Sequence, residues 1–293
     1  MKVGIAGLGL MGASLALALR KNNSGLTVLG RDKNRDHLDY VLDKGIIDGE
    51  LKAGTGCVDF FFAAVPVRSI PEVIGDCYSF LCPGETVVSD LGSTKVWVAR
   101  EIADRFPGLS YIGGHPVAGK EVSGPRAAEG ELFRGCQYVL TPPGGEPGHA
   151  GDLERLRNLI VSTGCEVSVL APAEHDRLLA VTSHLPQVVA SILVNYLNGV
   201  EDSLPEADRF IGSGFRDTTR IAASNPGMWL DIFATNGEHV SSAIGGLIEE
   251  LEELRRLISA GDESGQKEIL EKSRNRRLAL KKVGDNETEG TAG

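Results

Sequence analysis

The stretch "KVGIAGLGLMGASLA", residues 2–16, decides the fold of the amino-terminal half of the chain. A short apolar run leads into glycines at positions 7, 9 and 12, and helix-forming residues follow. Gly7 permits a tight turn, Gly9 lets a ligand approach the backbone, and Gly12 allows the helix to pack closely on the strand. The pattern predicts a dinucleotide site with the diphosphate at the amino end of the helix.

The acidic residue expected of such a site is Asp32, at the end of the next apolar run. An acidic side chain at this place accepts hydrogen bonds from the adenosine ribose and repels a 2′-phosphate, which favours NAD. Arg31 and Lys33 flank Asp32 and have the opposite tendency, so NADP stays an alternative. The residues predicted to contact the cofactor are Gly7, Gly9, Leu10, Met11, Gly12, Arg31, Asp32, Val65 and Pro66.

The chain changes character after residue 171. Before it, short apolar runs such as 26–32, 59–66, 86–92 and 137–143 alternate with helical patterns. They predict an α/β, Rossmann-type, doubly wound and mostly parallel sheet over residues 1–171. Long helical patterns then predict an all-helical substrate and dimerisation domain over residues 172–283, and the polar residues 284–293 predict a disordered tail.

Two helical patterns in the second half carry further predictions. Residues 174–197 are apolar over much of their surface, as in a bundle helix, and Pro186 predicts an interruption near His184. Further on, an a/d seam either packs within its own domain or forms a dimer interface. Its members are Val240, Ile244, Leu247, Leu251, Leu254 and Ile258.

Composition narrows the function classes. The 293 residues are 42% hydrophobic and 24% charged, as in a soluble globular protein. A formal charge of −10 argues against nucleic acid as a partner. We expect no membrane span or signal peptide and therefore a cytoplasmic location. The five cysteines are scattered, so we expect reduced thiols, with neither a disulfide framework nor a metal site.

Three polar segments carry candidate chemistry: "SDLGSTK" (89–95), "GGHPVAGKEVSG" (113–124) and "GSGFRDTTRIAASNPGMWLDIF" (212–233). They supply Ser93, His115 and an arginine pair, Arg216 and Arg220, which would share one face of a helix. The arginines alternatively pair with carboxylates such as Asp217. Beside a nicotinamide, these side chains suit hydride removal from an anionic hydroxy compound.

Taken in order, these segments together with "HDRLLAVTSHLPQ" (175–187) resemble the prephenate and arogenate dehydrogenases of tyrosine biosynthesis over residues 1–282. The resemblance implies that neutral His115 accepts a hydrogen bond from the ring hydroxyl and that Ser93 orients the two. It also implies that Arg220 holds the ring carboxylate by a charge-assisted pair. Softer matches imply substrate contacts for His184, Arg216, Glu121 and Trp229. Structural roles remain alternatives for the two aromatic residues of this group, and His37, His149, His175 and His239 are expected to be solvent-exposed or structural.

The expected enzyme is a homodimeric, NAD-preferring oxidoreductase that converts prephenate to 4-hydroxyphenylpyruvate. Arogenate is the close alternative substrate. Two more distant hypotheses are a β-hydroxyacid dehydrogenase for another small acid and a non-catalytic dinucleotide-sensing dimer. Neither a separate tyrosine-sensing domain nor a chorismate mutase domain is expected in this length of chain.

Overall fold

A computed structural model describes residues 1–120, 122–145, 151–200 and 203–284. The chain forms two compact units, Met1–Val240 and Ser241–Gly293, each of which is described by itself. The predictions for Glu121 and for residues 285–293 of the tail fall outside the described residues. Gly284, where the tail was expected to begin, is instead the last residue of a helix.

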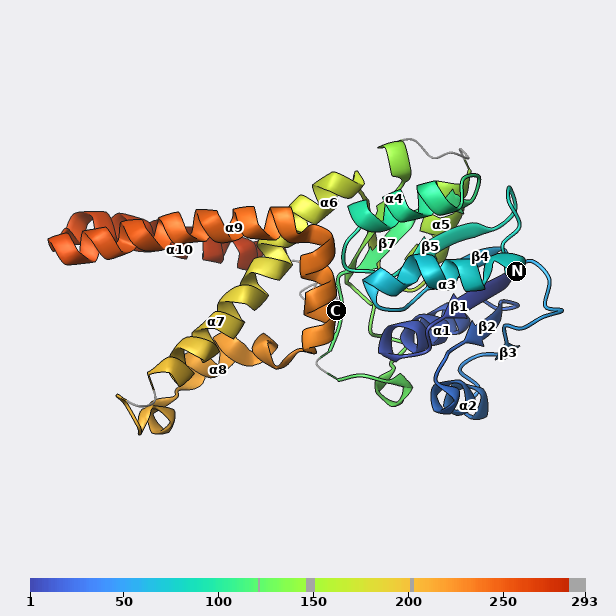
Figure 1. The fold of residues 1–293 in the computed structure, drawn as a ribbon, viewed down its shortest axis with the longest axis horizontal. Coiled ribbons are helices and arrows are strands. Elements are labelled where there is room, and N and C mark those ends of the chain that lie inside the picture. Colours follow the sequence, from blue (N-terminus) through green and yellow to red (C-terminus); the bar gives the residue numbers. More distant parts are fainter. Residues whose placement is uncertain (121, 146–150, 201–202, 285–293) are drawn as a thin grey trace, which may run out of the picture. The chain divides into compact units, whose positions relative to one another are not determined.

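The first unit is built on a parallel sheet (Figure 1). Its strand order is β3-β2-β1-β4-β5-β6, and each pair of neighbours is parallel. The strands are β1 (Lys2–Ala6), β2 (Thr27–Arg31), β3 (Gly49–Glu50), β4 (Phe60–Ala63), β5 (Val87–Asp90) and β6 (Ser110–Tyr111). The strand order reverses between β1 and β4, and doubly wound sheets bind their ligands at such a switch point. The predicted Rossmann-type fold is confirmed.

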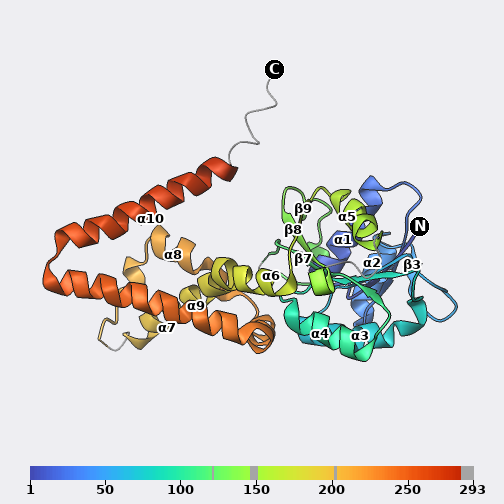
Figure 2. The same ribbon diagram turned by 90° about the horizontal axis from the view of Figure 1, so that it is seen from above.

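Helices cover both faces of this sheet (Figure 2). On one side lie α1 (Leu10–Asn22), α2 (Arg35–Asp43) and α5 (Asp152–Val161), and on the other α3 (Ile70–Asp76) and α4 (Val96–Arg105). Successive side chains of β4 point into the two cores in turn: Phe60 and Phe62 into the first, Phe61 and Ala63 into the second. Burial of each phenylalanine contributes about 1.5–3 kcal/mol, so β4 holds both layers to the sheet.

A second, three-stranded sheet holds the candidate histidine. Its order is β7-β8-β9, with β7 (Gly113–Pro116) antiparallel to β8 (Gln137–Thr141) and β9 (Glu166–Val169) parallel to β8. The expectation that residues 137–143 join the main parallel sheet is therefore wrong. A Cβ on Gly114 would lie 2.5 Å from the carbonyl oxygen of Asp90, so the glycine lets β7 lie close to β5.

The remaining elements of the first unit are helical. They are α6 (Pro172–Leu179), a π turn (Ala180–His184), α7 (Leu185–Gly199), α8 (Ser213–Thr219) and the first part of α9 (Pro226–Ala260). Short 3₁₀ turns are Val67–Ser69, Tyr78–Phe80, Pro125–Ala127, Pro143–Gly145, Ala207–Phe210 and Arg220–Ala223. Pro186 has no N–H to donate, and the π turn just before it ends at His184, so the interruption predicted there is confirmed.

The helical run Pro172–Gly199 is long and apolar enough to cross a membrane by length and composition, the one such helix among the described residues. No membrane span is expected from the sequence, and this run does reach the length and hydropathy of one. Core helices of soluble proteins pass the same test, but only 28% of its apolar window is buried within this chain. The run thus carries apolar surface that this chain leaves uncovered.

The second unit contains the end of α9 and α10 (Glu263–Gly284). Leu257 is buried there, and its carbonyl oxygen accepts a hydrogen bond from Gln266 Nε2 at 3.2 Å. The predicted helix is confirmed. Leu257, one position away from the predicted seam, is buried, and the seam residues Ile244, Leu247 and Leu254 are half-buried. Two seam residues, Leu251 and Ile258, are 57% and 60% exposed.

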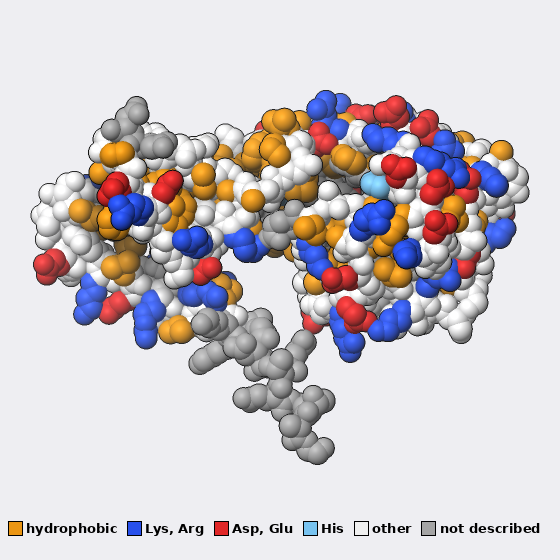
Figure 3. All heavy atoms as spheres, turned by 90° about the horizontal axis from the view of Figure 1, so that it is seen from below, with side chains coloured by type: hydrophobic (Ala, Val, Ile, Leu, Met, Phe, Trp, Pro, Cys, Tyr) orange, Lys and Arg blue, Asp and Glu red, His pale blue; other side chains and the backbone are white. Residues whose placement is uncertain are grey.

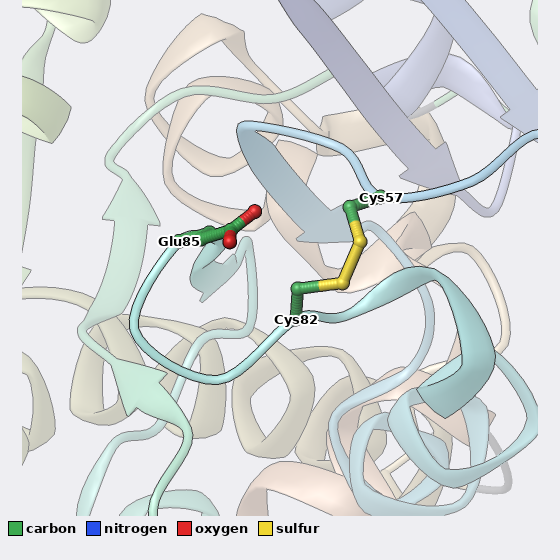
Figure 4. Close-up of side chains that lie close together, drawn as sticks. All are labelled: Cys57, Cys82 and Glu85. Carbon is green, nitrogen blue, oxygen red and sulfur yellow. A yellow bond between two sulfur atoms is a disulfide. The ribbon is translucent and has the colours of Figure 1, made fainter.

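The structure corrects the expectation for two cysteines. Cys57 and Cys82 form a disulfide with their Cα atoms 5.8 Å apart, beside Glu85 (Figure 4). The two residues precede the neighbouring strands β4 and β5, so the fold brings together positions that lie 25 residues apart in the sequence. Cys77, Cys136 and Cys165 are free thiols, as expected. A bonded pair lacks the thiolates that bind metal.

Candidate active site

The glycine turn after β1 has the shape of a diphosphate site. Gly7 has φ +92°, and a Cβ there would lie 2.3 Å from the carbonyl oxygen of Ala64. A Cβ on Gly12 would lie 1.9 Å from the carbonyl oxygen of Gly7, whereas one on Gly9 would meet nothing within 4 Å. No side chain caps the amino end of α1 at Gly9. The backbone N–H groups of its first turn are therefore available to an anion beside open space.

Asp32 is fixed at the end of β2 by the backbone. Its carboxylate accepts the N–H of Leu8 at 2.6 Å and that of Asn34 at 2.7 Å. Arg31 and Lys33 on either side of it are exposed. An acidic group held at this edge suits a ribose hydroxyl, and the two cations point into solvent.

The other predicted cofactor residues border the same edge of the sheet. Leu10 is buried and Met11 half-buried on the first turn of α1. Half-buried Val65 and exposed Pro66 follow β4 directly. The predicted set thus lies at the carboxyl ends of β1, β2 and β4.

His115 lies buried on β7, rather than being held out on a loop. Burial, reinforced by His175 and then Lys95, lowers the pKa of His115 well below its ordinary value of 6.5. Its ring is therefore neutral at physiological pH. Its Nδ1 lies 2.8 Å from Nε2 of His175, which is fully buried on α6 and also has a lowered pKa because of burial. His175, which was expected to be solvent-exposed or structural, is thus buried and in direct contact with His115.

A buried ion pair supports the backbone beside His115. Lys95 pairs with Asp90, and its Nζ also donates to the carbonyl oxygen of Gly114 at 2.7 Å. Tyr111 donates its hydroxyl to the other oxygen of Asp90 at 2.6 Å. Burial lowers the pKa of Lys95 and raises that of Tyr111. Because a buried charge without its partner is costly, this cluster holds the start of β7 firmly.

His184 and Trp229 form a second, adjoining group. His184 is buried at the end of the π turn, its Nδ1 3.3 Å from Nδ2 of Asn236, and its ring packs edge-on against Trp229 at 5.9 Å between centroids. Within the described part of the chain, three buried polar atoms here have no hydrogen-bond partner: Nε2 of His184, Oε1 of Gln187 and Nε1 of Trp229. Buried polar atoms are costly when unpaired, so this group fits a polar ligand.

The arginine pair does not share one regular helix. Arg216 lies in α8, which ends at Thr219, and Arg220 begins the 3₁₀ turn that packs against α7. Both are exposed, and Arg216 donates to the carbonyl oxygen of Ile211 at 3.3 Å. The predicted i, i+4 helical face is therefore corrected, because the helix changes type between the two positions.

Ser93 lies half-buried in the turn between β5 and α4. The hydroxyl of neighbouring Thr94 lies 2.8 Å from that of Thr235 on α9, which ties this turn to the helical part of the first unit. An orienting role of Ser93 toward His115 stays a prediction.

Comparisons with known proteins agree with this arrangement. A model of the prephenate dehydrogenase nucleotide-binding domain matches residues 15–169, and one of the prephenate dehydrogenase dimerization domain matches residues 171–272. A curated prephenate dehydrogenase of Bacillus subtilis is 34% identical, over 88% of this chain and 70% of its own length. The chain belongs to the prephenate dehydrogenase family.

Solved structures of this family share its fold. A prephenate dehydrogenase from Aquifex aeolicus in complex with hydroxyphenyl propionate and NAD⁺ has a TM-score of 0.89 and 32% identity, covering 96% of this chain and 98% of that chain. An arogenate dehydrogenase from Synechocystis has a TM-score of 0.82 and 28% identity, covering 96% and 100%.

Two residues of this site had no sequence signal of their own: Asp176, which contacts His175, and Asn236, which contacts His184. Lys95, which supports the strand of His115, is the last residue of the candidate segment "SDLGSTK". The adjacent "HD" of residues 175–176 at the start of a helix was the one pattern that could have drawn attention to Asp176.

Proposed function

We propose that this protein oxidises and decarboxylates prephenate to 4-hydroxyphenylpyruvate and transfers the hydride to NAD⁺. Both family models and the Bacillus subtilis relative support an oxidoreductase of this kind. The Aquifex aeolicus structure, which contains hydroxyphenyl propionate and NAD⁺, supports the cofactor and a phenolic ligand.

The observation that carries the proposal is the buried, neutral His115 with Nδ1 held by His175. Its Nε2 is then the nitrogen that accepts the hydrogen bond from the ring hydroxyl. As that proton moves to Nε2, the oxygen forms a carbonyl and the hydride leaves the same ring carbon. The C–C bond to the ring carboxylate then breaks and CO₂ departs. The electron pair of that bond moves through the ring to the carbonyl oxygen, so the ring becomes aromatic and the oxygen becomes a phenolate that can take the proton back from Nε2.

The cofactor supplies the hydride acceptor when it is bound at the glycine turn. Gly7, Gly9 and Gly12 would hold its diphosphate, and Asp32 its adenosine ribose. The open space over Gly9 and the uncapped start of α1 fit a dinucleotide.

Most of the proposed substrate contacts come from the helical part of the first unit, and Ser93 comes from the turn between β5 and α4. Arg220 would hold the ring carboxylate, and Ser93 would orient the hydroxyl near His115. His184 and Trp229 have unpaired buried nitrogens that suit oxygens of the substrate side chain. Arg216 is proposed to border this side chain, and Glu121 is proposed to act as a gate or hydrogen-bonding group. Because aromatisation drives the reaction, these residues need to orient the substrate more than to supply a strong base.

Arogenate and NADP remain the alternatives for substrate and cofactor. Arogenate is kept as an alternative substrate because the Synechocystis arogenate dehydrogenase matches 96% of this chain. NADP is kept as an alternative cofactor because exposed Arg31 lies beside Asp32.

We propose that the protein works as a homodimer through its helical domain, residues 172–283. The match of a dimerization-domain model to residues 171–272 supports both this assembly and the boundary at 171/172. Hydrophobic side chains lie at the surface of the helical part (Figure 3). Among them, Ile192 and Tyr196 of α7 are 59% and 70% exposed. A cytoplasmic location suits a biosynthetic enzyme of this kind.

The test is a four-way assay of NADH or NADPH formation with prephenate and arogenate, each with NAD⁺ and NADP⁺. We expect the fastest turnover with prephenate and NAD⁺. Reduction in none of the four combinations would refute the enzyme, and faster turnover with arogenate would replace the substrate.

A further inference from the structure

His115, His175 and Asp176 form a row of buried side chains joined by hydrogen bonds. Nδ1 of His115 lies 2.8 Å from Nε2 of His175, and Nδ1 of His175 lies 2.8 Å from Oδ1 of Asp176. All three residues are buried, His175 and Asp176 almost completely. His115 comes from β7, whereas the other two come from α6 in the helical part of the unit.

The backbone around Asp176 fixes the direction of these hydrogen bonds. Oδ1 of Asp176 also accepts the N–H of Lys95 at 2.8 Å, and Oδ2 accepts the N–H of Val96 at 2.9 Å. Both oxygens are thus acceptors, so Nδ1 of His175 must be the donor in its bond to Asp176. In a neutral imidazole one nitrogen donates and the other accepts. Nε2 of His175 therefore accepts, Nδ1 of His115 donates, and Nε2 of His115 is left with its lone pair.

We infer that His175 and Asp176 are positioning residues that hold His115 in the tautomer able to accept the proton of the substrate hydroxyl. This inference rests on the proposed function for its catalytic meaning. The row also stabilises His115 after it has taken up that proton, because His175 Nε2 and the Asp176 carboxylate face the new positive charge.

The same residues make the arrangement rigid. Lys95 connects to both ends of the row: its backbone N–H binds Asp176, and its side chain binds the carbonyl oxygen of Gly114, next to His115. The backbone carbonyl of Asp176 in turn accepts Nδ2 of Asn236 at 2.8 Å. Neither histidine can turn its ring without breaking a buried hydrogen bond.

The first test observes the tautomer directly and needs no substrate. In protein labelled with ¹⁵N-histidine, long-range ¹H–¹⁵N spectra distinguish a protonated ring nitrogen from one with a lone pair, and His115→Asn identifies the signals of His115. We expect protonated Nδ1 and unprotonated Nε2 at neutral pH. A wild-type His115 protonated on Nε2 would overturn the inference.

The second test uses variants that differ in what they offer to His115. His175→Gln keeps an acceptor near the position of Nε2, His175→Phe removes it, and Asp176→Leu removes the acceptor that fixes the tautomer of His175. We expect a mixture of His115 tautomers in His175→Phe and in Asp176→Leu, and the wild-type tautomer in His175→Gln. Unchanged His115 signals in both Asp176→Leu and His175→Phe would contradict the inference.

Kinetics give the functional readout. We expect kcat to fall about 10- to 100-fold in His175→Phe with little change in KM, and His175→Gln to recover most of the loss. His239→Gln, at a half-buried histidine of α9 for which no contact with His115, His175 or Asp176 is seen among the described residues, is the control that should leave the His115 signals unchanged. Equal losses in His175→Phe and His175→Gln would show that only packing matters. If the wild type reduces neither cofactor, the proposed function fails while the spectra still test the tautomer.

Discussion

Asn236 Nδ2 lies 3.3 Å from His184 Nδ1, and the same amide nitrogen lies 2.8 Å from the backbone carbonyl oxygen of Asp176. A carbonyl oxygen only accepts, so the Asn236 amide is oriented with its donor inward, and His184 Nδ1 must accept the second proton. Neutral His184 therefore carries its proton on the unpaired Nε2. Asn236 makes His184 a donor toward the ligand.

Loss of this donor should weaken substrate binding. His184→Phe keeps an aromatic ring against Trp229 but removes the Nε2–H, and we expect KM to rise about tenfold with a smaller change in kcat. Steady-state kinetics at saturating NAD⁺ measure this. A large drop in kcat at constant KM would instead place His184 at the reacting ring.

Two glycine substitutions should separate cofactor binding from folding. Gly9→Ala places its methyl group in open space, so we expect the melting temperature to stay unchanged while NAD⁺ binds about tenfold or more weakly. Gly12→Ala places its methyl group against the carbonyl oxygen of Gly7, so we expect a loss of about 1–3 kcal/mol of unfolding free energy. Thermal melts and NAD⁺ titration measure both. Equal melting temperatures of the two variants would refute this description of the turn.

Stability should fall in mild acid because three histidines are buried in neutral form. Burial lowers the pKa values of His115, His175 and His184, the last to about 4. Above pH 6.5 neither the folded nor the unfolded chain protonates these rings, so the stability is fully present. As the pH falls below 6.5, only the unfolded chain takes up protons, and each ring costs up to about 1.4 kcal/mol per pH unit until its folded pKa is reached.

Urea unfolding at several pH values between 7 and 5 measures this slope. His184→Gln should reduce the slope by the contribution of up to one bound proton, about 1.4 kcal/mol per pH unit. Lys52→Gln, in an exposed loop, should leave the slope unchanged. A wild-type unfolding free energy that stays constant over this range would contradict the neutral, buried state of the three rings.

The cofactor part of the site could be predicted from the sequence because its signals lie within short segments of the chain. The glycine turn, Asp32 and the α/β order follow from spacing and hydrophobic pattern. Strand β7 could not be predicted, because "GGHP" has two glycines and a proline, which strands disfavour except at a sheet edge such as this one. His175 and the Cys57–Cys82 pair were missed because their partners are distant in sequence and only the fold brings them together.

The apolar seam of the second unit, of which Leu251 and Ile258 are exposed, should form part of a dimer interface. Leu247→Glu together with Leu251→Glu would place charges on a helix face whose Leu251 is 57% exposed in the single chain. We expect light scattering to show a shift from dimer to monomer with the fold retained by circular dichroism. The matched change Arg255→Glu, at an exposed position outside the seam, should leave the dimer intact. A folded dimer of the double variant would remove the seam from the interface.

The most direct test of the account is the turnover of His115→Asn with prephenate and NAD⁺. Asparagine can keep a hydrogen bond toward His175 but cannot take up the hydroxyl proton as a neutral imidazole does. We predict that kcat falls at least about 100-fold while KM and the melting temperature stay close to the wild-type values. A folded His115→Asn variant with near-normal kcat would contradict the role of His115.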